Sequence, residues 1–233
     1  MRIVFTWDDG SPFDKKLFDL HRKYNIPGMF FVPTFNSEGR ETIDEECLKA
    51  NVSDLISFGG HTYNHVFLTT LTLPNVKEEI MLNKQYLEKN IKKEIRHFCF
   101  PGGKYNKRIM EIALSCFETC RTADTLNVRN KRKVIKPTFH FYPRSYKSVL
   151  FNCAKHFNFS FFCWNLFHPK VGYFDRIKRL IERFHKRDFD VVVWGHSWEI
   201  EELLLWDQLE DLFAFIKNHF FSCVCKYDDL FSC

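Results

Sequence analysis

The chain has 233 residues, of which 45% are hydrophobic and 27% are charged, and its formal net charge is +5. This length and balance are typical of a soluble globular protein with a substantial core. The charge is mild and the densest basic stretch covers only residues 129–133, which argues against a nucleic-acid-binding protein. No run approaches the roughly 18 consecutive apolar residues of a membrane-spanning helix, so none is predicted.

The cysteines and the N-terminus favour a cytoplasmic protein. The chain contains nine cysteines, an odd number, and no pair has the CxxC spacing of a zinc or redox motif. We therefore expect reduced thiols that serve mostly as small core residues. Only three apolar residues separate Arg2 from Thr6, so no signal peptide is expected at this end.

The beginning of the chain has the pattern of a β-α-β unit. Residues 2–6 are mostly β-branched or aromatic and predict a strand. Residues 11–24 predict a helix, because their apolar side chains recur at helical spacing. A turn at residues 25–28 leads to a second apolar strand at residues 29–32. Two strands joined by a helix in this way are expected to lie parallel.

The alternation of helices and strands continues along the chain. Further helices are predicted over residues 44–58, 75–92, 106–117 and 203–218. Further strands are predicted over residues 97–100 and 190–194. Residues 128–165 show no clear period and are expected to contain antiparallel strands or a long loop. The pattern predicts one α/β domain over residues 1–233 with mostly parallel strands, whose C-terminal ends form the working face in barrels of this kind.

Two polar clusters follow predicted strands. Asp8 and Asp9 stand in the stretch TWDDG, where either side chain could be a simple turn or helix-cap carboxylate. His61 and His65 stand in HTYNH, four residues apart, and if the backbone is helical there they share one face and can share one metal. On its own, the histidine pair also has a structural or incidental explanation.

Together, two histidines and one carboxylate supply the three protein ligands of an open catalytic metal site. The second aspartate then has a separate role, because it stays off the metal and acts as a general base toward bound water. The same three ligands would also suit a non-haem iron oxygenase, which has no need of a second aspartate.

Four segments carry a family resemblance. They are TWDDG, HTYNH, RHFCFPGG at residues 96–103, and WGHSWEIE, which contains His196. The first three resemble T-F-D-D-G, H-[ST]-x-x-H and R-x-F-R-x-P-x-G, which are motifs of the polysaccharide deacetylases, the NodB-homology carbohydrate esterases. His196 stands where the last motif of that family has its histidine. Order and spacing agree over about residues 2–216.

The resemblance implies a distorted (β/α) barrel of the NodB/polysaccharide deacetylase type that binds a divalent metal, with Zn²⁺ the expected ion. It implies that Asp9, His61 and His65 are the metal ligands. It makes Asp8 the general base and His196 the general acid that protonates the leaving amine. Backbone N–H groups near Gly102 or Gly103 would hold the oxyanion. The expected substrate-binding residues are Pro101, Gly102, Gly103, Trp198 and Glu199.

Two departures from the family pattern concern the supporting residues. Cys99 stands where the third motif has its second arginine, which should orient Asp8 through a charge-assisted pair. Asp8 therefore needs another tether or is held more loosely. The groove motif D-[ST]-W-x-x-W is not legible, and residues 162–165 near its expected place offer only Trp164.

Other polar and aromatic side chains have more than one interpretation. Trp198 could stack on a sugar ring, and Glu199 could bind a hydroxyl group or pair with the nearby catalytic histidine. A helix start and core packing explain both residues equally well. Arg121 and Arg144 could contact an anionic group of the substrate, whereas His140 is isolated in the sequence and is expected to be structural.

The sequence thus predicts a metal-dependent hydrolase that removes the N-acetyl group from an amino sugar and releases acetate. The sugar could belong to a glycan polymer, a lipid-linked sugar or a nucleotide-linked sugar. Three alternatives stay open: a related C–N hydrolase acting on an N-formyl sugar or a small ring amide, a non-haem iron oxygenase, and a sugar-binding pseudo-enzyme. No nucleic-acid partner is expected, and the oligomeric state is open.

Overall fold

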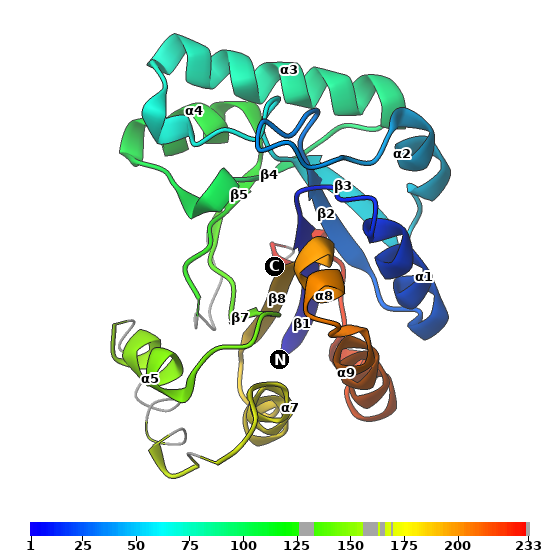
Figure 1. Cartoon of the computed structure of the whole chain (residues 1–233), viewed down its shortest axis with the longest axis vertical. Helices are drawn as coiled ribbons and strands as arrows, with labels where there is room; N and C mark the ends of the chain where they lie inside the picture. The colour runs from blue at the N-terminus through cyan, green and yellow to red at the C-terminus, as the bar shows by residue number, and fades with distance from the viewer. Residues whose placement is uncertain (126–132, 156–162, 164–165, 169, 232–233) are drawn as a thin grey trace.

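The structure is a computed structural model that describes residues 1–125, 133–155, 163, 166–168 and 170–231. Its centre is a sheet of eight parallel strands in the order β6-β5-β4-β3-β2-β1-β8-β7. The strands are β1 (Arg2–Asp8), β2 (Gly28–Val32), β3 (Ile56–Gly60), β4 (His97–Cys99), β5 (Thr119–Arg121), β6 (Val134–Ile135), β7 (Phe139–His140) and β8 (Asp190–His196). The sheet curls into a half-barrel and stays open, with β6 and β7 at its two edges (Figure 1). The predicted α/β barrel with parallel strands is confirmed.

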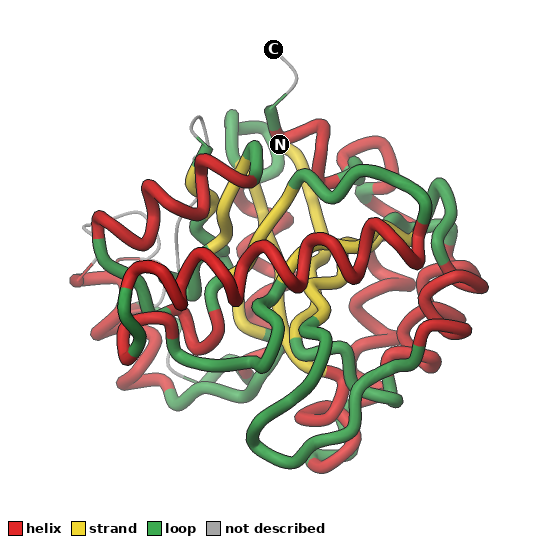
Figure 2. The backbone as a smooth tube through the Cα atoms, turned by 90° about the horizontal axis from the view of Figure 1, so that it is seen from above, coloured by secondary structure: helices red, strands yellow, loops and turns green. Residues whose placement is uncertain are grey.

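Helices surround the curled sheet, as the view from above shows (Figure 2). The α-helices with described bounds are α1 (Asp14–Tyr24), α2 (Glu45–Asn51), α3 (Leu73–Ile91), α4 (Lys107–Cys116), α5 (Tyr146–Lys155), α7 (Tyr173–Phe184), α8 (Ser197–Glu202) and α9 (Trp206–His219). Asp44 and Asn106 lie one position before two of these helices, and their carboxylate or amide oxygens accept a hydrogen bond from a first-turn N–H. No helix in the described part of the chain is both long and apolar enough to cross a membrane.

Strand alternation explains why β1 can serve both the core and a polar site. Ile3, Phe5 and Trp7 are buried in the larger core cluster, which also contains residues of α1 and α9. Val4 belongs to a second, smaller cluster with residues of β2, β4 and β8 and with the C-terminal segment. Asp8 lies on the same face of the strand as Val4, so its side chain is directed to the barrel interior.

Most predicted elements agree with the structure to within a few residues, but two predictions need correction and one helix was missed. The predicted helix over residues 44–58 ends at Asn51, and its last part is strand β3, which pairs with β2. Within residues 128–165, antiparallel strands are one of two alternatives, and the described strands β6 and β7 are parallel to their neighbours, so this alternative is wrong for them. Helix α7 was not predicted. The basic stretch 129–132 and Trp164 lie outside the described residues.

Candidate active site

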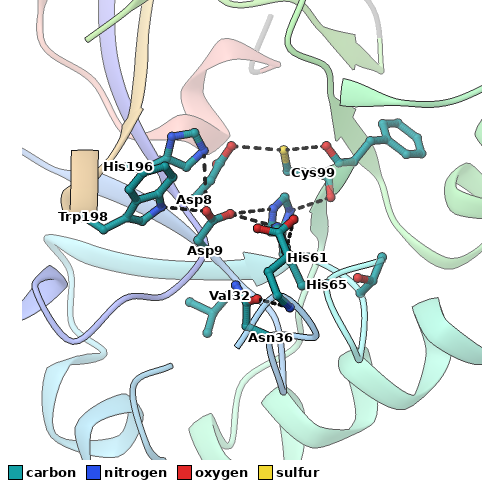
Figure 3. A network of polar contacts seen from close by, with 12 residues as sticks. Asp8, Asp9, Val32, Asn36, His61, His65, Cys99, His196 and Trp198 are labelled. Atoms are coloured by element: carbon teal, nitrogen blue, oxygen red, sulfur yellow. Dashed lines mark hydrogen bonds and ion pairs between the residues drawn. The ribbon is translucent and has the colours of Figure 1, made fainter. Parts of the chain in front are cut away.

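The C-terminal ends of β1 and β3 bring Asp9, His61 and His65 together (Figure 3). Asp9 follows β1 with a φ of 76°, a left-handed conformation that turns its side chain away from the strand direction. Its Oδ1 atom lies 3.3 Å from Nε2 of His61 and 3.0 Å from Nε2 of His65. All three side chains are buried, so their polar atoms are shielded from bulk water.

A tight loop, and not a helix, places the two histidines side by side. Thr62 and His65 have φ angles of 68° and 53°, so the backbone of HTYNH is not helical, and the loop brings the two rings together instead. The buried side chain of Asn83 on α3 fixes the start of this loop. Its Oδ1 atom accepts a bond of 2.8 Å from the backbone N–H of His61, and its Nδ2 atom donates 3.1 Å bonds to the Val32 carbonyl and the Thr34 hydroxyl.

The hydrogen bond of the His61 ring and the convergence of the three side chains indicate that these residues fit a cation. Nδ1 of His61 lies 2.8 Å from the carbonyl oxygen of Cys99 and donates to it, which leaves a lone pair on Nε2 of the neutral ring. That lone pair points toward the Asp9 side chain. Burial raises the pKa of the Asp9 carboxyl group, but the positive charge of nearby His196 is the largest opposing effect, and the pKa lies well below its usual range. Two nitrogen atoms and one ionised oxygen that converge in this way are a suitable donor set for a divalent metal such as Zn²⁺.

Asp8 is held by an arginine from another strand. Arg121, at the end of β5, has no exposed surface, and its Nη2 atom forms an ion pair with Oδ2 of Asp8. The same nitrogen lies 2.9 Å from Sγ of Cys99, and Cys99 faces Arg121 directly in the β4–β5 register. Arg121 is therefore engaged with Asp8 and is not presented to a substrate. Oδ1 of Asp8 is buried with no hydrogen-bond partner among the described residues, so this oxygen is available to accept a proton.

His196 lies opposite Asp8 in the β1–β8 register and belongs to a second polar chain. Its Nδ1 atom lies 2.7 Å from Oε2 of Glu199, and the same oxygen lies 2.9 Å from Nε2 of His140. Burial disfavours a charged ring, but Asp9 and Glu199 raise the pKa of His196 to about 9. Hydrogen bonds from both histidines hold the pKa of Glu199 at about 2, against the effect of burial. The arrangement thus keeps a proton on His196.

His140 is part of this site although it is isolated in the sequence. Its ring stacks on Trp194 with a centroid distance of 3.9 Å, and Nη2 of Arg144 donates to its Nδ1 atom at 2.9 Å. The Nε2 proton of His140 is therefore directed at Glu199. The spacing of three residues between His196 and Glu199 indicates their pairing, whereas nothing in the local sequence indicates His140.

The residues expected to bind substrate have unequal positions. Pro101, Gly102 and Gly103 form a 3₁₀ turn in which both glycines have positive φ, and the Gly103 N–H already donates to the Phe100 carbonyl at 2.9 Å. Gly102 is therefore the better candidate for an oxyanion donor. The indole N–H of Trp198 donates to Oδ2 of Asp9 at 2.9 Å (Figure 3), and its ring packs on His196 and beneath the Arg40 guanidinium. Trp198 thus supports Asp9 in addition to any contact with a sugar.

The fold and the site define a class of α/β-barrel proteins with a candidate metal centre at the strand ends, and the comparisons identify the family. The model of the family described as polysaccharide deacetylase matches residues 1–116, and this part of the chain belongs to that family. The peptidoglycan-N-acetylglucosamine deacetylase of Bacillus cereus is 26% identical over 113 residues, which are 48% of this chain and 51% of the relative. The chain thus matches about half the length of this curated relative.

Solved structures show the same fold over nearly the whole chain. A peptidoglycan N-acetylglucosamine deacetylase bound to a naphthalenyl N-hydroxybenzamide has a TM-score of 0.63 at 14% identity, and the match covers 99% of this chain and 88% of that one. A family 4 carbohydrate esterase described as a pseudoenzyme, from Bacillus anthracis, has a TM-score of 0.58 at 13% identity, with coverages of 98% and 64%. At these identities the likeness concerns the fold alone.

Proposed function

We propose that the protein is a metal-dependent hydrolase that removes the N-acetyl group from an amino sugar and releases acetate. The observation that carries this proposal is the convergence of Asp9, His61 and His65 between an oriented carboxylate, Asp8, and a protonated imidazole, His196. The family of residues 1–116 supports the same chemistry. When bound by the three ligands, the expected Zn²⁺ ion would polarise the amide carbonyl and lower the pKa of a water molecule.

The residues of the chain divide the proton transfers between them. The unpartnered Oδ1 atom of Asp8 accepts the proton of the attacking water, while Arg121 holds the other oxygen in place. The new C–O bond forms as the carbonyl oxygen gains negative charge, which the backbone N–H of Gly102 can stabilise. His196 donates its proton to the nitrogen as the C–N bond breaks. The products are acetate and the free amine of the sugar.

The surroundings of the three ligands favour hydrolysis over the open alternatives. A non-haem iron oxygenase would have no use for a base and an acid on either side of the metal, and both are present here with dedicated partners. A pseudo-enzyme would be expected to lack part of this set. We also propose that residues 1–233 form one catalytic domain, because a single sheet runs from β1 to β8.

The state of the cysteines supports a cytoplasmic location as part of this proposal. The free thiols among the described residues are Cys47, Cys99, Cys116, Cys120, Cys163, Cys223 and Cys225. Unpaired cysteines in this number fit a reducing compartment.

The proposal is tested by metal analysis together with acetate and formate release from a panel of sugars. The panel contains N-acetylglucosamine oligomers, UDP-N-acetylglucosamine, a polyprenyl-linked N-acetylglucosamine and the matching N-formyl sugars. We expect about one divalent ion per chain and acetate release that stops on chelation and returns with Zn²⁺. Release of neither acid from any sugar, or full activity of the chelated protein, would contradict the proposal.

A further inference from the structure

A cavity of about 360 Å³ lies beside the candidate site, on the open side of the half-barrel. Its walls come from the end of β4 and β5 on one side and from β7, β8, α5 and α7 on the other, the elements that face each other across the gap in Figure 1. The volume falls within the range of about 300–1,000 Å³ that is usual for small-molecule sites. We call this space the arginine cavity, after Arg144 and Arg176 in its wall.

The charge of the arginine cavity has one sign. Arg144 and Arg176 are the charged residues of the described wall, and this wall contains no aspartate or glutamate. Arg176 is buried, and its Nη2 atom is fixed by bonds of 3.1 Å and 2.7 Å to the carbonyls of His168 and Val171. Arg144 is exposed, and one of its nitrogen atoms donates to His140. A guanidinium has five N–H groups, so Arg144 keeps donors for a ligand.

The arginine cavity is continuous with the residues of the proposed reaction. Gly102 and His140 belong both to its wall and to the site described above. The ring centroids of His140 and His196 are 5.6 Å apart, with Glu199 bonded to both rings. A substituent that occupies the cavity would therefore be attached close to the sugar nitrogen that His196 protonates.

We infer that the arginine cavity binds the phosphate or diphosphate group of a phosphorylated amino sugar. The inference rests on the proposed function and narrows its substrate class from N-acetylated amino sugars in general to those that carry a phosphate group. Arginine suits this role, because its planar N–H groups match phosphate oxygens and remain charged. Nucleotide-linked and lipid-linked sugars carry the same diphosphate chemistry, and the experiment distinguishes these two sources.

The test compares N-acetylglucosamine with its 1-phosphate, its UDP conjugate and a short polyprenyl diphosphate conjugate. Arg144→Gln removes the exposed guanidinium, and Asn152→Asp adds a carboxylate to the cavity wall with little change in shape. Arg108→Gln on α4 and Asn218→Asp on α9 make the same changes at exposed positions elsewhere. The dissociation constant, by titration calorimetry, and kcat/KM are both measured for every combination of protein variant and sugar. All measurements use the full chain.

We expect the unsubstituted protein to prefer phosphate-bearing sugars over N-acetylglucosamine by about tenfold or more, in both dissociation constant and kcat/KM. Arg144→Gln and Asn152→Asp should each reduce this ratio about tenfold, and the two control variants should keep it. The ratio between the phosphate-bearing sugars and N-acetylglucosamine, measured with one and the same variant, is insensitive to a general loss of activity. A preference for either the UDP or the polyprenyl conjugate supports the inference and names the source.

A ratio near one in the unsubstituted protein, or a ratio that neither cavity variant changes, would overturn the inference. The two readouts separate this failure from that of the proposed function. Tighter binding of sugar phosphates without acid release from any sugar would keep the anion site and reject the deacetylase. Acid release without any preference for phosphate-bearing sugars would keep the deacetylase and reject the anion site.

Discussion

Asp8 shows how one residue of the site depends on a partner that is distant in the sequence. Its Oδ2 atom is paired with Arg121, and both side chains are buried beside Cys99. The family motif would place this arginine at position 99, but here it comes from the neighbouring strand at the facing register position. The sequence predicts that Asp8 needs a tether, but it cannot identify Arg121, because the partner depends on the pairing of β4 with β5.

Because Arg121 is paired with Asp8, its substitution should change both kcat and the free energy of unfolding. Arg121→Gln should lower kcat by about 10- to 100-fold with little change in KM, because Asp8 loses its orientation. It also leaves a buried charge unpaired, at a cost of about 3–5 kcal/mol in the free energy of unfolding. Steady-state kinetics and urea denaturation measure the two effects, with Arg108→Gln as the exposed control.

A relocation experiment separates positioning from a merely structural role. In the double variant, Cys99→Arg and Arg121→Cys exchange the arginine and the cysteine. The guanidinium group then stands at the position that the family motif gives it. We expect this double variant to recover at least about tenfold in kcat over Arg121→Gln, since a charge-assisted pair with Asp8 is restored. A folded Arg121→Gln protein with unchanged kcat would show that Arg121 has no part in orienting Asp8.

At the scale of elements, the loop after β3 depends on helix α3. Asn83 bonds to the backbone of His61, to Val32 and to Thr34, and so joins the ends of β2 and β3. The local sequence identifies HTYNH as a ligand motif but leaves its backbone geometry open, because spacing alone does not reveal the positive φ angles of Thr62 and His65. The loop geometry is set by these tertiary bonds.

Substitution of Asn83 should therefore weaken metal binding. Asn83→Ala leaves the His61 N–H without its acceptor, and we expect zinc affinity to fall by about 10- to 100-fold. Stability should fall by about 1–3 kcal/mol. The matched control is Asn90→Ala on the same helix, because Asn90 donates within α3, to the carbonyl of Tyr86, and not to the loop after β3 among the described residues. Equal zinc affinities for the two variants would contradict this account of the loop.

The contact of α1 with β1 predicts an acid-sensitive step in stability. His21 is fully buried, donates from Nδ1 to the Ile26 carbonyl and accepts at Nε2 from the Trp7 indole, each at 2.7 Å. Burial lowers its pKa from 6.5 to about 4. Between about pH 6.5 and pH 4, the unfolded chain binds a proton at this histidine and the folded protein does not. The free energy of unfolding therefore falls as the pH decreases through this window, and His21 has no such effect above it.

Urea denaturation between pH 7 and pH 4.5 measures this effect. The unsubstituted protein should lose up to about 1.4 kcal/mol per pH unit more than His21→Gln within the window. The exposed His219→Gln variant should follow the unsubstituted protein. Parallel pH profiles for His21→Gln and the unsubstituted protein would show that His21 already carries its proton in the folded state or does not titrate there.

At the scale of the whole molecule, prediction succeeded where periodicity is local and strong. The first β-α-β unit, helices α3, α4 and α9, and strand β8 follow from apolar spacing and capping residues. The opening of the sheet between β6 and β7 does not follow from the sequence, because strands of two residues give almost no periodic signal. His140 lies on β7, and the arginine cavity lies beside it. Neither could be predicted, because both depend on this weakly periodic part of the sheet.

The central claim is that Asp8 and Asp9 have unequal roles, with Asp9 on the metal and Asp8 acting on water. The most direct measurement is zinc content together with acetate release for Asp8→Asn and Asp9→Asn. We expect Asp8→Asn to keep its zinc and to lose about 10²- to 10⁴-fold in kcat, whereas Asp9→Asn should lose the zinc itself. Full activity of a zinc-loaded Asp8→Asn protein would contradict the account.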